Sequence, residues 1–187
     1  MPTQKNQQPD YGPPWVGIAW MILTGLLFVM VIGVVRYIGS DIPAAEAAFI
    51  RYVIGLMFML PFLRGAFKKG FSGKSLGIYS MRGITHALGV ILWFYAMANI
   101  PIAEVTAIGY TSPIYITIGA AIFFGERMAA RRIFAVLAAF IGAMIILRPG
   151  IQEISYGQLA QVLSAPLFAI SYLTAKSLSK DESPTVI

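Results

Sequence analysis

The sequence predicts an all-α membrane protein with six transmembrane helices. Its 187 residues are 58% hydrophobic and 12% charged, about half the charged fraction of a soluble domain. The apolar residues form long runs, and a helix needs roughly 20 of them to cross a bilayer. The chain has no cysteine and one histidine, so we expect no disulfide, no metal centre and no cofactor.

The first two helices follow a polar N-terminal segment. Residues 1–14 are rich in Gln, Asn and Pro and are predicted to form a disordered cytoplasmic tail. The first helix is expected at 15–38 and the second at 45–63, with Glu46 near its start and Arg51 near mid-membrane. A charge at the bilayer centre costs about 3 kcal/mol or more. Arg51 therefore needs a partner or a water-filled cavity. Its role is either to bind a substrate or to stabilise the structure.

The third helix is expected at 76–98 and carries two basic side chains on one face. Arg82 and His86 are four residues apart, which aligns them along a helix. His86 is either a proton relay, since its pKa moves easily, or a neutral imidazole that packs against a neighbouring helix. Trp93 is either a packing residue or an aromatic wall of a pocket.

The fourth helix, expected at 101–126, is the stretch around which the others are arranged. Polar residues and a proline interrupt its apolar run at mid-membrane: Tyr110, Thr111, Ser112, Pro113 and Tyr115. Proline removes a backbone donor, and freed backbone groups at membrane depth occur where protein or a wet cavity lines them. The stretch is therefore either a wall of a substrate pathway or a helix–helix contact. Glu104, in its first turn, is a proton-coupling candidate or an interfacial residue.

The last two helices are expected at 133–147 and 156–178. Lys and Arg gather between the second and third helices and between the fourth and fifth, whereas the opposite segments hold few. Because cytoplasmic segments carry the excess of Lys and Arg, the N-terminus is expected in the cytoplasm. The net charge of +6 thus indicates membrane orientation rather than nucleic-acid binding.

The sixth helix repeats part of the pattern of the first. Gly17, Leu27 and Phe28 of the first helix are each matched by a residue of the same type 140 positions later, in the sixth helix. We therefore expect a five-helix repeat at 15–150, while 151–187 holds a loop, the sixth helix and the start of a second, truncated copy. An odd number of helices inverts the second copy, which is typical of secondary transporters. The partner is then the missing second half of the same chain or a second copy in a homodimer.

Four segments together resemble the EamA branch of the drug/metabolite transporter superfamily: FIRYVIGLMFMLP (49–61), LWFYAMANIPIAEVTAIGYTSPIY (92–115), FFGERM (123–128) and FIGAMIILRPG (140–150). The matching positions are an arginine, a mid-helix proline, a Gly-Glu helix ending and a glycine: Arg51, Pro113, Gly125, Glu126 and Gly142. One departure is Ala135, where relatives often carry glycine. The resemblance implies typically ten helices in two inverted halves, and an inner-membrane carrier of small metabolites, often amino acids or related compounds.

The leading hypothesis is a secondary transporter of a small metabolite in the cell inner membrane that works by alternating access. Arg51 would bind a substrate carboxylate bidentately, and Tyr110 and Tyr115 would flank the body of the substrate. The proton-coupling candidates are His86, Glu104 and Glu46. The alternative is a non-transporting membrane assembly or scaffold subunit. An enzyme is not expected, because catalysis needs clustered acids, bases or metal ligands and the carboxylates here are scattered.

Overall fold

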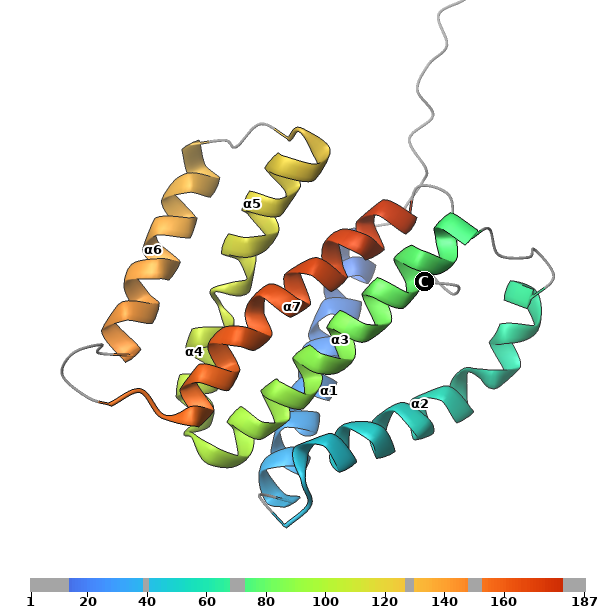
Figure 1. Ribbon diagram of the computed structural model, residues 1–187, viewed down its shortest axis with the longest axis horizontal. Coiled ribbons are helices and arrows are strands. Elements are labelled where there is room, and N and C mark those ends of the chain that lie inside the picture. The colour runs from blue at the N-terminus through green and yellow to red at the C-terminus, as the bar shows by residue number, and fades with distance from the viewer. Residues whose placement is uncertain (1–13, 39–40, 68–72, 127–129, 148–152, 180–187) are drawn as a thin grey trace, which may run out of the picture. The chain divides into compact units, whose positions relative to one another are not determined.

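The computed structural model describes residues 14–38, 41–67, 73–126, 130–147 and 153–179. Its elements are α1 (Pro14–Ile38), α2 (Ala44–Phe67), α3 (Gly73–Asn99), α4 (Ile102–Gly109), α5 (Ser112–Phe124), α6 (Ala130–Leu147) and α7 (Tyr156–Leu178) (Figure 1). No strand occurs within these ranges, so the prediction of an all-α fold is confirmed. The tail predicted at 1–14 lies outside the described residues, apart from Pro14, which begins α1.

The chain is a multi-pass membrane protein. Within the described residues, four stretches are long and apolar enough to cross a bilayer: Trp15–Ile38, Ala44–Pro61, Ile102–Phe124 and Tyr156–Leu178. The helices α3 and α6 are not among them. α3 carries Arg82 and His86 within its length, and α6 begins with Arg131 and Arg132. The prediction of six membrane-spanning helices is therefore borne out for four of them and stays a prediction for α3 and α6.

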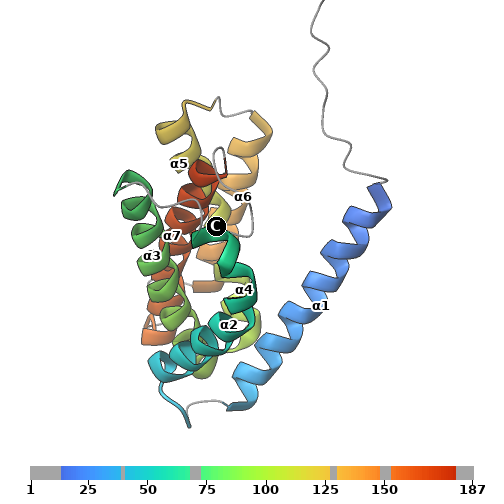
Figure 2. The same ribbon diagram turned by 90° about the vertical axis from the view of Figure 1, so that its right-hand side faces the viewer.

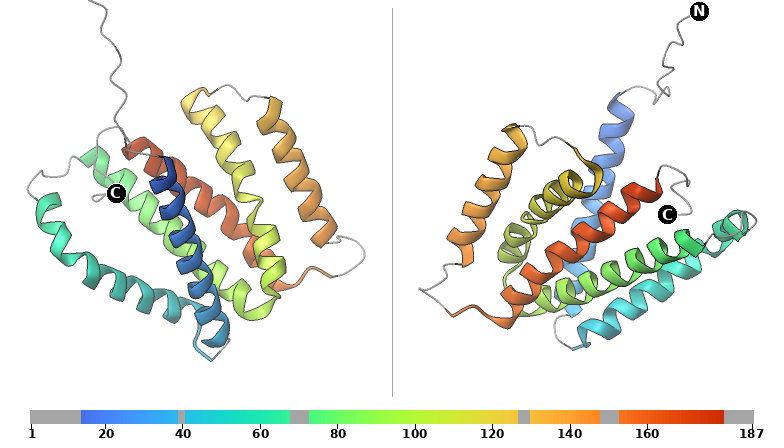
Figure 3. Two further views of the ribbon diagram at one scale, coloured as in Figure 1. Left: turned by 180° about the vertical axis from the view of Figure 1, so that it is seen from behind. Right: turned by 45° about the horizontal axis from the view of Figure 1, so that its top comes forward.

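The chain forms two units, residues 1–37 and 38–187. The first unit holds α1, whose membrane-spanning stretch has no buried residue. Thr24 Oγ1 of α1 donates to the Trp20 carbonyl at 2.8 Å, so this hydroxyl is satisfied within its own helix, as a lipid environment requires. The second unit holds α2 to α7. Its helices follow the order α6, α5, α7, α3 and α2 across the view (Figures 1 and 3).

The antiparallel helices α3 and α7 form the core of the second unit (Figures 1 and 2). Arg82 of α3 lies beside Ser171 of α7, and at the opposite end a Cβ on Gly157 would come 2.7 Å from Ile100. Met97 of α3 is fully buried. The buried face of α7 is rich in small and polar residues: Gly157, Ala160, Gln161, Ser164, Ala165, Ala169 and Ser171. Such residues let membrane helices approach closely.

The helix predicted at 101–126 is two helices in the structure, α4 and α5, joined at Tyr110 and Thr111. Thr111 N–H donates to the Ile108 carbonyl at 2.9 Å, a three-residue step that tightens the chain. Pro113 lies in the first turn of α5, where its missing N–H is tolerated. The continuous helix expected from the sequence is therefore corrected to two shorter ones, because the proline starts a helix instead of kinking one.

The remaining helix boundaries lie within a few residues of the predictions, and α7 spans the predicted 156–178. A reciprocal capping box fixes its start. Gln158 N–H donates to Ser155 Oγ at 3.2 Å, and Ser155 N–H donates to Gln158 Oε1 at 3.0 Å. These bonds satisfy two backbone donors that an open helix end would leave unpaired.

Candidate functional site

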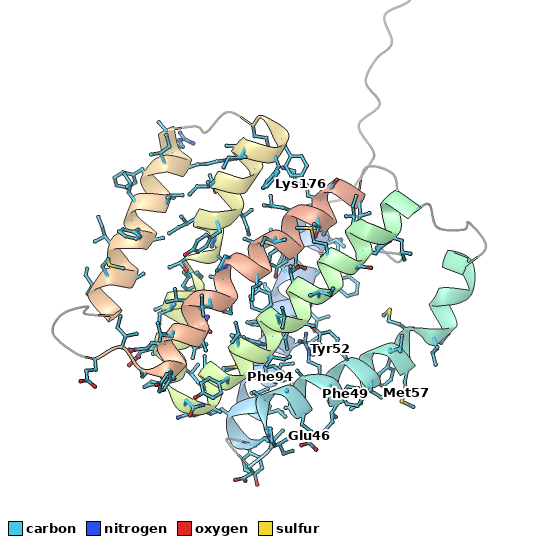
Figure 4. All side chains as sticks on the ribbon, in the orientation of Figure 1. Glu46, Phe49, Tyr52, Met57, Phe94 and Lys176 are labelled. Atoms are coloured by element: carbon cyan, nitrogen blue, oxygen red, sulfur yellow. The ribbon has the colours of Figure 1, made fainter. Side chains whose placement is uncertain are left out.

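A guanidinium lies beside aromatic rings of α2 and α3, and a ring of α7 joins this group through His86 and Trp93. We call this group the arginine–aromatic cluster, and it contains Arg51, Tyr52, His86, Trp93, Phe94 and Phe168. The Arg51 Cζ atom lies 5.7 Å from the centroid of the Tyr52 ring and 6.0 Å from that of Phe94, distances at which a cation is attracted to a ring. Figure 4 shows Tyr52 and Phe94 between the ribbons of α2 and α3. Both ion pairs found among the described residues use Glu126, so no described carboxylate neutralises Arg51.

Phe168 brings α7 into the cluster. Its ring centroid lies 5.5 Å from that of His86 and 6.5 Å from that of Trp93, edge-on in both cases. A glycine makes this approach possible, because a Cβ on Gly89 would lie 3.1 Å from the Phe168 ring. The cluster thus offers aromatic faces beside a cation, an arrangement that can hold a planar ring with a negatively polarised edge.

Three of the predicted pathway residues, Arg51, His86 and Trp93, come together in this cluster. Sequence reasoning missed the other three rings of the cluster, Tyr52, Phe94 and Phe168. The signal for Phe168 was its position on the face of a membrane helix that also carries Gln161 and Ser171, since polar side chains in apolar helices usually face neighbouring helices. A substrate-binding role for the cluster stays a prediction.

The residues predicted at 110–115 divide between two environments. Thr111 is buried, and its Oγ1 donates to the Ile108 carbonyl at 2.7 Å. The outward members are Tyr110, Pro113 and Tyr115, and Ser112 is half-buried. The structure therefore does not gather this stretch on one surface. The Thr111 hydroxyl is used in a hydrogen bond to the backbone of its own turn.

Gln161 of α7 faces the end of α4, beside the break between α4 and α5. A Cβ on Gly109 would lie 3.2 Å from Gln161 Nε2. The side chain is 2% exposed, and its Oε1 meets no hydrogen-bond donor among the described residues. Such a buried, unsatisfied acceptor costs about 1–3 kcal/mol. Sequence reasoning did not single out this residue, although a glutamine within an apolar helix is itself a signal.

The helix α7 connects the break to the cluster. Gln161 lies beside Gly109 at the break, and Phe168 belongs to the arginine–aromatic cluster. Seven residues separate them in the sequence, which is nearly two helical turns, so they lie on one side of α7 about 10.5 Å apart along its axis.

The proton-coupling candidates have different neighbours. Glu104 Oε2 accepts a hydrogen bond from Gln158 Nε2 at 2.9 Å, which ties the start of α4 to the start of α7. Glu46 is exposed on the outer side of α2 (Figure 4), and His86 lies among rings. Their proposed role in proton coupling stays a prediction. Within the described residues, no group of three or more His, Asp or Glu side chains is placed to hold a metal ion.

Arg82 has a structural contact on α7. Its Nη1 atom donates to the Ser171 carbonyl at 3.0 Å and lies 3.4 Å from Ser171 Oγ. Hydrogen bonds from a charged donor are the stronger ones in proteins. Arg82 therefore holds α3 against α7 one helical turn before His86 and fixes the side of α3 that meets the cluster.

An ionic group joins the ends of α5, α6 and α7. Glu126 accepts hydrogen bonds from Lys176 and from Arg132, the latter at 3.5 Å. The hydrogen bond from Lys176 is the largest cause that lowers the pKa of Glu126, and the nearby charge of Arg132 adds to it. Lys176 Nζ also lies 5.1 Å from the centroid of the Phe124 ring. Figure 4 shows Lys176 at this end of α7.

Residues 15–148 match the EamA-like transporter family. A riboflavin transporter of Rhizobium johnstonii is 38% identical over 186 residues, covering 92% of this chain and 58% of the relative. A riboflavin transporter of Vibrio cholerae is 32% identical over 178 residues, covering 93% and 60%. An S-adenosylmethionine uptake transporter of Rickettsia bellii is 25% identical over 168 residues, covering 90% and 58%. The chain thus spans 58% to 60% of the length of these relatives, and no solved structure matches it.

Proposed function

The chain belongs to the EamA-like transporter family, and we propose that the whole protein is a secondary transporter that moves a small metabolite across the inner membrane by alternating access. The observation that carries this proposal is the arginine–aromatic cluster. Arg51 lies among rings without a described carboxylate partner. An arginine within a membrane helix usually pairs with an acid or a carbonyl. Because no described carboxylate pairs with Arg51, its N–H donors are available to a ligand.

The predicted domain organisation is part of this proposal. A five-helix repeat at 15–150 agrees with the family match at 15–148, and 151–187 would begin a second, inverted copy. The greater length of the relatives supports a pathway formed between two such halves. The second half would come from the same natural chain or from a second copy.

For the substrate, we propose a planar aromatic metabolite of the riboflavin type in place of the amino acid expected from the sequence. The relatives at 38% and 32% identity are named riboflavin transporters. The rings of the cluster suit stacking against a flat molecule. The Arg51 guanidinium suits ring carbonyl oxygens, because it can stack and donate several hydrogen bonds at once.

Uptake of radiolabelled riboflavin into proteoliposomes that contain the full-length protein tests this function. Arg51→Leu should lower uptake about 10-fold to 100-fold, the loss expected when charge-assisted hydrogen bonds disappear. Arg51→Lys keeps the charge but not the planar fork, so it should recover only part of the uptake. Arg131→Leu removes an exposed arginine outside the cluster and serves as the matched control.

Two outcomes would contradict parts of the proposal. Riboflavin uptake that survives both Arg51 variants would show that Arg51 does not bind the substrate. Failure of correctly inserted protein to take up riboflavin or S-adenosylmethionine, the compounds named for its relatives, would count against transport, and the non-transporting scaffold subunit would then become the better hypothesis.

A further inference from the structure

The amide of Gln161 is the most conspicuous unsatisfied polar group of the described structure. The residue is 2% exposed, and its Oε1 atom has no hydrogen-bond donor among the described residues. Glutamines in membrane helices usually bond across to a neighbouring helix. A buried amide that lacks such a bond costs free energy, and a ligand that supplies the donor would recover it.

The backbone next to Gln161 is shaped to admit this amide. Gly109 ends α4, and a Cβ there would lie 3.2 Å from Gln161 Nε2. Pro113, four residues later, has no N–H to donate to the Gly109 carbonyl. Tyr110, which directly follows Gly109 in the chain, is 68% exposed. The buried amide therefore lies beside Gly109, next in the chain to a residue that reaches the surface.

We propose that Gln161 is a substrate-recognition residue whose carboxamide binds, edge to edge, a planar amide of the transported molecule, namely a ring N–H beside a ring C=O. A primary amide presents an acceptor and a donor side by side in one plane, and glutamine uses this pair to read the edge of adenine in DNA. The inference rests on the proposed function and deepens it. The pyrimidinedione edge of a flavin has this pattern, whereas a free amino acid does not.

The position of Phe168 agrees with this binding mode. It lies on the same side of α7 as Gln161, about 10.5 Å further along the axis, and belongs to the arginine–aromatic cluster. A fused-ring molecule is of comparable length. Its polar edge would meet Gln161 while its ring body reaches the aromatic side chains.

The experiment compares riboflavin with its N3-methyl derivative, in which the ring N–H is replaced. Uptake by the full-length protein in proteoliposomes is measured for both compounds. The natural protein should prefer riboflavin at least about tenfold, because the methyl group leaves Gln161 Oε1 without its donor. Gln161→Met keeps the length of the side chain and should bring the ratio close to one by lowering riboflavin uptake.

Gln158→Met is the matched control. It removes an amide from the same helix that already bonds Glu104 and Ser155. This variant should unfold at a lower temperature and keep the natural preference for riboflavin. A changed preference in Gln158→Met would show that any loss of a helix amide alters selectivity, and the assignment to Gln161 would be overturned.

The remaining outcomes separate the recognition role from the function. If riboflavin is transported but the natural protein takes up both flavins equally, the proposed edge contact is wrong and transport stands, whatever the variants do. The same conclusion follows if Gln161→Met keeps the natural preference. If the natural protein transports neither flavin, the proposed substrate class fails together with the recognition role.

Discussion

At the scale of single residues, the carboxylate of Glu126 is held by Lys176 and Arg132. The hydrogen bond from Lys176 is the main cause that lowers the pKa of Glu126 below its ordinary value of 4.5. A carboxyl whose pKa is lowered by folding contributes stability above its unfolded pKa and loses that stability as the pH falls through the folded pKa. We therefore expect the unfolding temperature of the purified protein in detergent to fall as the pH drops below about 4.5.

The variant Glu126→Gln tests this prediction, because an amide does not titrate in this range. It should unfold at a slightly lower temperature at neutral pH, since exposed ion pairs contribute little, and should lose less stability on acidification. Glu153→Gln changes an exposed carboxylate without an ion pair among the described residues and should retain the natural acid response. An identical acid response in Glu126→Gln and the natural protein would contradict the Lys176 interaction.

The sequence predicts some site residues well because their residue types are unusual in a membrane helix. Arg51 and His86 stand out as polar residues in apolar helices, and the structure places both in one cluster. Phe168 is an aromatic residue whose sequence signal is only the polar face of the helix that it shares, and the packing of α7 against α3 places it beside His86. The lack of a donor for Gln161 likewise depends on which backbone lies opposite, so no single-chain pattern contains it.

At the scale of elements, Gly157 sets the distance between α3 and α7 at one end of the pair. A Cβ there would lie 2.7 Å from Ile100 Cγ2 and 3.3 Å from Asn99 Cβ. Gly157→Leu should therefore lower the free energy of unfolding by about 1–3 kcal/mol, the usual cost of overpacking. Denaturant unfolding of the purified protein, followed by circular dichroism, measures the difference.

Gly142→Leu is the control for the loss of a helix glycine, because nothing lies within 4 Å of a Cβ at that position. It should be neutral or slightly stabilising, since glycine costs a helix interior about 1 kcal/mol relative to better helix formers. If Gly157→Leu behaved like Gly142→Leu, the close approach of α7 to α3 would be wrong.

The break between α4 and α5 shows how far helix prediction from sequence reaches. Pro113 indicates a disturbance near mid-membrane, but a proline can kink a helix or begin one. The structure has the second arrangement, with Thr111 bonded back to Ile108. Just before the break, Gly109 lies beside Gln161, a contact between segments far apart in the sequence that no local pattern contains.

At the scale of the whole molecule, charge distribution distinguishes the two ends of the second unit. One end carries Glu126, Arg132 and Lys176, where α5, α6 and α7 meet. The other end carries Glu104, bonded to Gln158, where α4 and α7 begin. Because Lys and Arg accumulate on the cytoplasmic side, we expect the first end in the cytoplasm, in agreement with a cytoplasmic N-terminus.

Single cysteines test this orientation without background from the chain, which has none of its own. Ala130→Cys lies at the start of α6 and Glu153→Cys lies in the exposed segment before α7. A membrane-impermeant maleimide added to intact spheroplasts should label Glu153→Cys, and permeabilisation should be needed to label Ala130→Cys. The reverse pattern would mean the opposite orientation. Equal labelling of both before permeabilisation would show that α6 does not cross the membrane, which would contradict six spanning helices and leave the N-terminal side to be decided by α1 and α2.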